Sequence, residues 1–225
     1  MKYQITGGGL PVAVCTLSPG EAVKTQSGGM SWMSPNMRMK TQMEGIGKAI
    51  SRRFAKESAF LNYYTPVKGT GLIAFASSFP GEIIPFNISP QNEIIIQKRS
   101  FLAAEATVDI SVYFQKKLGA AIWGGEGFVM QRLTGKGTAF AEIDGSVTTY
   151  ELGASDQIIL DTGYLAAMSP TCSLNIVPIP GAKNLLFGGE GVFNTIVNGP
   201  GKVWIQSIPI NRLVGLLRPH LSTEK

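Results

Sequence analysis

The sequence predicts an all-β protein built from repeated β-sandwich units, and three observations lead to that fold class. The tetrapeptide Gly-Gly-Glu-Gly occurs at 124–127 and again 64 residues later at 188–191. Self-similarity at a fixed spacing is the signature of one structural unit used more than once. Apolar Val108, Ile110, Val112 and Phe114 alternate with polar residues, as in a half-buried strand. The 27 glycines and 13 prolines spread along the chain favour many turns.

The residues around each tetrapeptide also match. A Gly-x-Gly follows at 135–137 and at 199–201, and residues 101–104 resemble 164–167. A more divergent third copy begins near Gly28. We therefore predict one compact unit over 1–225 with internal repeats at approximately 28–96, 97–160 and 161–211, followed by a C-terminal helix and tail at 212–225.

In two segments the apolar residues recur at the spacing of a helix rather than of a strand. Apolar residues at helical spacing predict a short helical insertion near 45–61, and its opposite side carries four basic residues, Lys48, Arg52, Arg53 and Lys56. One interpretation is a basic amphipathic helix that contacts an anionic membrane or a partner. The other is an ordinary surface helix docked on the β body. A second short helix is expected at 212–217, ended by Pro219 and packed on the sheets.

Composition limits the class of protein. Hydrophobic residues make up 44% of the 225 residues and charged residues only 16%, which argues against disorder. So little charge also suggests that another subunit covers part of the surface. The net charge of +5 favours anionic partners only weakly.

Cellular context follows from the cysteines and the N-terminus. Cys15 and Cys172 lie far apart in apolar contexts, so we predict buried, reduced thiols and a reducing compartment. The first five residues lack the apolar core of a secretion signal, and a cytoplasmic location is expected. The uncharged run 162–182 contains three prolines and alternates, which favours strands over a membrane-spanning helix.

The glycine motifs are the candidate ligand-binding residues. Glycines that adopt positive φ beside a carboxylate can form a binding concavity, and the residues concerned are Gly124, Gly125, Glu126 and Gly127, with Gly188, Gly189, Glu190 and Gly191. The alternative is a structural turn in which each glutamate accepts hydrogen bonds from nearby amides. Recurrence of the motif at equivalent places favours the structural role.

Catalytic constellations are missing from the sequence. His220 is the only histidine, which argues against histidine-based metal sites and against Ser-His-Asp or Cys-His catalysis within one chain. No glycine motif has the residues of a phosphate-binding loop. We expect no cofactor and no enzymatic activity, and we expect solvated or turn-capping roles for the carboxylates, namely Glu21, Glu82, Glu105, Glu142 and Asp144.

Five blocks of residues resemble the signature blocks of the "altered inheritance of mitochondria" twenty-four family, whose bacterial members were catalogued as a domain of unknown function. They stand in order at 17–21, 27–34, 57–62, 188–193 and 199–207. The resemblance implies a TRAP-like β fold, named after the tryptophan RNA-binding attenuation protein, and assembly into trimers. In fungi the relative is a mitochondrial inner-membrane protein needed for membrane organisation. This chain lacks an Arg- and Ser-rich transit peptide, which suggests a soluble bacterial or archaeal form.

Three functional hypotheses follow from these observations. The leading one is a non-enzymatic oligomeric scaffold or interaction protein with an unidentified protein partner and possible peripheral membrane contact. The second is a small-ligand-binding or enzymatic β-sandwich with its site at the Gly-Gly-Glu-Gly turns. RNA binding has the least support, because basic residues are not interleaved with exposed aromatics, and a nucleic-acid partner is not expected.

Overall fold

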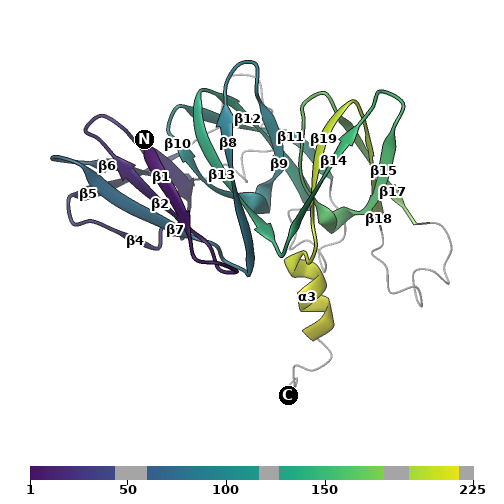
Figure 1. The fold of residues 1–225 in the computed structure, drawn as a ribbon, viewed down its shortest axis with the longest axis horizontal. Coiled ribbons are helices and arrows are strands. Elements are labelled where there is room, and N and C mark those ends of the chain that lie inside the picture. The colour runs from purple at the N-terminus through teal and green to yellow at the C-terminus, as the bar shows by residue number, and fades with distance from the viewer. Residues whose placement is uncertain (44–59, 117–126, 180–192, 218–225) are drawn as a thin grey trace.

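The computed structural model describes residues 1–43, 60–116, 127–179 and 193–217, and these residues confirm the all-β prediction. Their strands pair antiparallel throughout and form four sheets that follow one another along the long axis of the molecule (Figure 1). The described part contains one α-helix, α3 (Ile210–Leu217), which extends from one side of this row of sheets.

Two sheets, one of four strands and one of six, lie toward the N-terminus. The first has the order β1-β2-β7-β4, with β1 Lys2–Thr6, β2 Val12–Leu17, β7 Gly71–Ala76 and β4 Trp32–Met33. The second has the order β5-β6-β3-β10-β13-β8, with β5 Met37–Met43, β6 Phe60–Pro66, β3 Val23–Gln26, β10 Phe101–Glu105, β13 Gly137–Asp144 and β8 Gly81–Ile88.

The other two sheets complete the row. The third has the order β11-β12-β9-β16-β19-β14, with β11 Val108–Lys116, β12 Phe128–Gly135, β9 Ile94–Gln97, β16 Leu165–Met168, β19 Gly201–Gln206 and β14 Val147–Leu152. The fourth has the order β15-β18-β17, with β15 Gln157–Asp161, β18 Phe193–Asn198 and β17 Ser173–Pro178. Two 3-10 turns, η2 Lys98–Ser100 and η3 Thr162–Tyr164, precede β10 and β16.

The 64-residue offset of the sequence reappears in strand register. In the β10–β13 pair Phe101 lies opposite Ala141, and the register shifts before Ala103. In the β16–β19 pair Leu165 lies opposite Ile205, and the shift comes at the equivalent step. The two 3-10 turns are also 64 residues apart. Superposition of three whole units with the boundaries 28–96, 97–160 and 161–211 stays a prediction.

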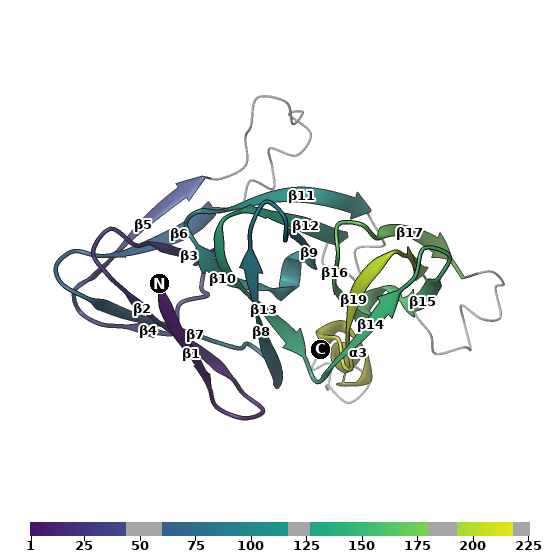
Figure 2. The same cartoon turned by 45° about the horizontal axis from the view of Figure 1, so that its top comes forward.

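Each six-stranded sheet joins two successive stretches of the chain. The second sheet combines β3, β5 and β6 with the later strands β8, β10 and β13, and the third combines β9, β11 and β12 with β14, β16 and β19. Figure 2 shows these mixed sheets at the centre of the molecule. Neighbouring stretches therefore share hydrogen bonds within one sheet, rather than stacking as closed units.

The apolar core fills the spaces between the sheets. One cluster joins Phe75 of the first sheet to Phe140 of the second, a second joins Ala139 to Leu133 of the third, and another joins Met130 to Val197 of the fourth. Both cysteines are free and buried, as predicted. The part of the uncharged run that the structure describes forms β16 and β17, and no helix among the described residues is long and apolar enough to cross a membrane.

Three local predictions need correction. Alternation along β11 breaks at a register shift between Val112 and Phe114, and Val112 is 47% exposed. Most of the predicted helix at 45–61 lies outside the described residues, but its last two residues begin β6 as a strand. The helix predicted at 212–217 is confirmed and begins two residues earlier, whereas its predicted packing on the sheets is wrong, because none of its residues is buried.

The Gly-x-Gly positions generate the first prediction. Gly137 and Gly201 begin equivalent strands with φ of +145° and +139°, and a Cβ on Gly201 would lie 2.6 Å from Thr171 Oγ1 and 2.8 Å from Ser169 Cβ. Because both the backbone and the space disfavour a side chain, Gly201→Ala should lower the free energy of unfolding in urea by about 1–3 kcal/mol. The control is Gly9→Ala, where an added Cβ meets nothing within 4 Å. Equal stabilities of the two variants would contradict this structural role.

Candidate functional site at the junction of the two six-stranded sheets

Nearly all the residues predicted as sites lie outside the described part of the chain. This holds for the glycine-motif residues Gly124, Gly125 and Glu126, for 188–191, and for the basic residues Lys48, Arg52, Arg53 and Lys56. Gly127 is described, and its φ of +80° fits the predicted turn before β12. The binding and membrane roles of these residues stay predictions.

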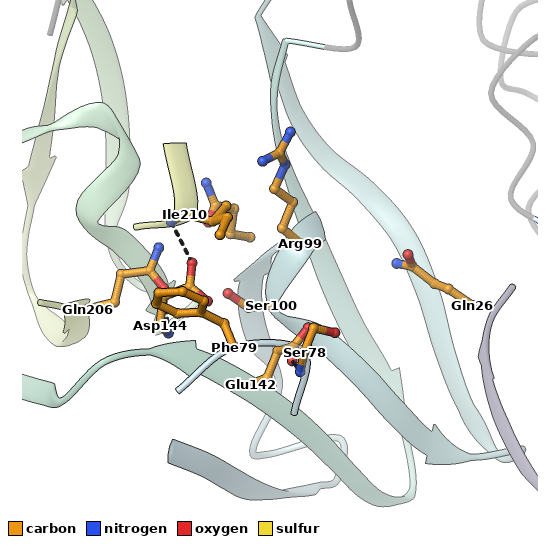
Figure 3. A pocket seen from close by; sticks show the side chains of 10 residues that line it. Gln26, Ser78, Phe79, Arg99, Ser100, Glu142, Asp144, Gln206 and Ile210 are labelled. Atoms are coloured by element: carbon orange, nitrogen blue, oxygen red, sulfur yellow. Dashed lines mark hydrogen bonds between the residues drawn. The ribbon is translucent and has the colours of Figure 1, made fainter. Parts of the chain in front are cut away.

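A cavity of about 280 Å³, lined mostly by polar and charged residues, is the strongest candidate site among the described residues. We call it the β13 cavity, because Glu142 and Asp144 of β13 line it together with Gln97 of β9, Gln206 of β19 and residues of η2. Phe79, from the connection between β7 and β8, and Ile210, the first residue of α3, complete its wall (Figure 3). The cavity thus draws on both six-stranded sheets.

Glu142 is held in the cavity wall by the β7–β8 connection. It and Asp144 stand two residues apart on β13, so both project from the same face of the strand. Glu142 Oε2 accepts hydrogen bonds from the Ser78 amide at 2.8 Å and the Ser77 hydroxyl at 3.3 Å. Burial nevertheless raises the pKa of Glu142, and the nearby charge of Asp144 adds to the rise.

Asp144 connects the cavity to the helix. Its Oδ2 accepts a hydrogen bond from the Ile210 amide at 2.8 Å, at the N-terminus of α3 (Figure 3), where a carboxylate is favourable. Its own amide donates to Gln206 Oε1 at 3.1 Å. Burial raises the pKa of Asp144, against the opposing effects of the Ile210 hydrogen bond and the positive charge of Arg99. Arg99 in turn donates from Nη1 to Asn211 Oδ1 of α3 at 2.8 Å.

Two further polar side chains of the wall are almost fully buried. Ser100 is 3% exposed and Gln97 is 5% exposed. Within the described residues, neither side chain has a hydrogen-bond partner, and Figure 3 shows the Ser100 hydroxyl pointing into the cavity on the side of Asp144. The buried side-chain atoms without a partner among the described residues are Gln131 Oε1 and Thr195 Oγ1. The polar atoms of Ser100 and Gln97 are not among them, so they are accessible from the cavity and open to a molecule in it.

The carboxylates expected to be solvated or turn-capping have mixed outcomes. Glu82 accepts a hydrogen bond from the Val147 amide at 2.9 Å, which is the predicted turn-capping role. Glu21 and Glu105 both form ion pairs with the amino group of Met1, and Glu21 also accepts a hydrogen bond from the Ser18 amide at 2.7 Å, which is a turn-capping contact. Glu142 and Asp144 also cap backbone amides, those of Ser78 and of Ile210 at the start of α3. The expectation did not include that both side chains line one cavity, where partial burial raises the pKa of each. Among the described residues no cluster of three or more His, Cys, Asp or Glu side chains could hold a metal ion.

The fold places this chain in the class of all-β proteins with layered antiparallel sheets. The chain belongs to the family described as Mitochondrial biogenesis AIM24, whose model matches residues 3–208, and this confirms the resemblance read from the five sequence blocks. An uncharacterized protein of Streptococcus pyogenes serotype M6 is 27% identical over 221 residues, covering 95% of this chain and 88% of that protein. A crystal structure of a Streptococcus pyogenes protein has a TM-score of 0.80 at 24% identity, covering 98% of this chain and 99% of the other.

The raised pKa of Glu142 makes stability depend on pH. Because the folded protein holds this proton more tightly than the unfolded chain, its contribution is complete below the ordinary pKa of 4.5 and is lost as the pH rises through the folded value. We expect Glu142→Gln, which keeps an oxygen for the Ser78 amide, to flatten the fall in stability between about pH 4.5 and neutrality. Urea unfolding at several pH values measures this.

Glu151→Gln is the matched control for that measurement. The Glu151 side chain is 67% exposed and its only ion pair in the described residues is a surface contact with Lys202 at 3.8 Å, so the same change in charge occurs away from the cavity. Its pH profile should follow that of the unchanged protein. A Glu142→Gln profile parallel to both would show that the burial of Glu142 has no effect on folding.

Proposed function

We propose that this protein is a non-enzymatic homo-oligomeric interaction protein, and that α3 contacts a second copy of the chain. The observation that carries the proposal is the uncovered apolar surface of α3. Val214 is 54% exposed, Leu216 57% and Leu217 47%. An exposed cluster of large apolar side chains on a soluble protein marks a contact surface.

The attachment of α3 explains why its apolar residues are uncovered within one chain. The Ile210 and Asn211 contacts with Asp144 and Arg99 hold its first turn, and the helix then extends away from the sheets (Figure 1). An isolated eight-residue helix is marginal in water. Contact with a partner would stabilise it by burying the apolar side chains.

A second copy is the partner that best fits the rest of the surface. β5 and β6 carry another exposed apolar patch, composed of Met39, Met43 and Phe60, and Met43 lies directly opposite Phe60 in the strand pair. Two unlike patches on one chain favour a head-to-tail contact, and such contacts form a ring where the rotation between copies closes. A ring of three is the assembly that the family resemblance implies, and a chain with only 16% charged residues has little polar material to cover a monomer.

The non-enzymatic part of the proposal rests on the residues available for catalysis. The single histidine, His220, leaves no pair of histidines in one chain for acid–base or metal chemistry. The proposal places the protein in the cytoplasm. If Lys48, Arg52, Arg53 and Lys56 contact a membrane, a trimer would present that group three times, and avidity would strengthen a weak individual attraction.

Light scattering tests the assembly. The unchanged protein at micromolar concentration should have about three times the 24.1 kDa chain mass. Val214→Lys combined with Leu217→Lys should lower that mass toward the monomer, because two charges would have to be buried at the contact. Lysine is a good helix former, so circular dichroism should show an intact fold.

Leu10→Lys is the control for the charge change, because Leu10 is an equally exposed apolar residue in the connection between β1 and β2. It should leave the mass unchanged. A monomer at every concentration of the unchanged protein would refute the oligomer. An unchanged mass in the double variant would place the contact elsewhere than α3.

A further inference from the structure

We propose that the β13 cavity is a binding site for a small organic molecule that carries an ammonium group. None of the Gly-Gly-Glu-Gly residues is among those that line the site, and the proposal does not depend on the proposed oligomer. Three features of the cavity support this ligand class: its charge, its unused hydrogen-bonding groups and its size.

The charges of the wall favour a monovalent cation. Glu142 and Asp144 supply two carboxylates, and Arg99 supplies one guanidinium that is already engaged by Asn211 through Nη1. One negative charge is left over when both carboxylates are ionised. Burial raises the pKa of each carboxyl group, as expected where carboxylates are removed from water without enough positive charge nearby. An ammonium group would supply that charge.

The unused groups of the wall suit the three N–H donors of an ammonium group. Ser100 and Gln97 are more than nine-tenths buried as whole residues, and their hydroxyl and amide groups have no hydrogen-bond partner among the described residues and are accessible from the cavity. For Asp144, the hydrogen bond recorded for the carboxylate is to Oδ2 alone, from Ile210. Oxygen atoms from three different elements, η2, β9 and β13, therefore line one cavity with capacity to accept further hydrogen bonds.

The size of the cavity favours an organic cation over a bare ion. Its volume of about 280 Å³ is several times the ~30 Å³ that one water occupies in the liquid. A metal ion would leave most of that space unfilled, and the described residues provide only two carboxylates there rather than a set of three ligands. The Phe79 ring in the wall offers a surface for the apolar part of an amine.

Isothermal titration calorimetry with butylammonium chloride tests the site. The full-length protein should bind one butylammonium per chain saturably at neutral pH, at constant ionic strength set with sodium chloride. Butan-1-ol has the same carbon chain and lacks the charge, so it should bind at least about tenfold more weakly. Equal affinity for the amine and the alcohol, or no saturable binding of the amine, would overturn the proposal.

Variants assign the binding to the cavity. Asp144→Asn and Glu142→Gln keep an acceptor oxygen but lose the charge, and each should weaken butylammonium binding at least about tenfold. Glu151→Gln removes the same charge from an exposed position on β14 and should leave the affinity unchanged. If all three variants bind equally well, the amine binds elsewhere and the proposal fails.

Ser100→Ala keeps the test decisive if a charge variant does not fold. It removes only the buried hydroxyl that points into the cavity (Figure 3), so the protein should fold and bind butylammonium several-fold more weakly. Undiminished binding in a folded Ser100→Ala protein, together with undiminished binding in whichever charge variant folds, would exclude the cavity.

Discussion

The structure depends on one constraint, which is that the central strands of each six-stranded sheet are covered on both faces, whereas edge strands such as β5 and β14 are largely exposed. The second sheet contributes Phe140 to the core on one side and Ala139 to the core on the other. A strand in such a position cannot show the alternation of apolar and polar residues that is typical of a sheet with one solvent-exposed face. Every side chain from Phe101 to Ala104 is buried, as is every side chain from Leu165 to Met168. The alanine pairs in these strands let sheets on both sides approach.

This constraint explains which parts of the fold the sequence predicts. The 64-residue offset is visible in sequence because the central pairs β10–β13 and β16–β19 have equivalent neighbours and the same register shift. Strands near the ends of the row have different neighbours, and their sequences diverge accordingly. The break in alternation at Val112 follows from a register shift, which depends on the partner strand β12 and cannot be read from β11 alone.

The β13 cavity could not be predicted for a related physical reason. Glu142 and Asp144 alternate with apolar Ala141 and Ile143, and this pattern is the same for a strand with one face in water. Only the tertiary structure places Ser78, Gln206 and the first turn of α3 over that face. Likewise, the apolar spacing of α3 predicts a helix but not whether its own sheets or another chain cover it.

Asp144 is a residue of both the cavity wall and the attachment of α3. Its carboxylate lines the cavity and accepts the hydrogen bond that holds the N-terminus of α3. An ammonium group beside Asp144 would favour the ionised form of that carboxylate, and the ionised form is the better partner for a helix N-terminus. Occupation of the cavity would therefore stabilise the attachment of α3, and with it any contact that α3 makes with a second chain. By linkage, assembly through α3 would raise the affinity of the cavity for the cation by the same factor.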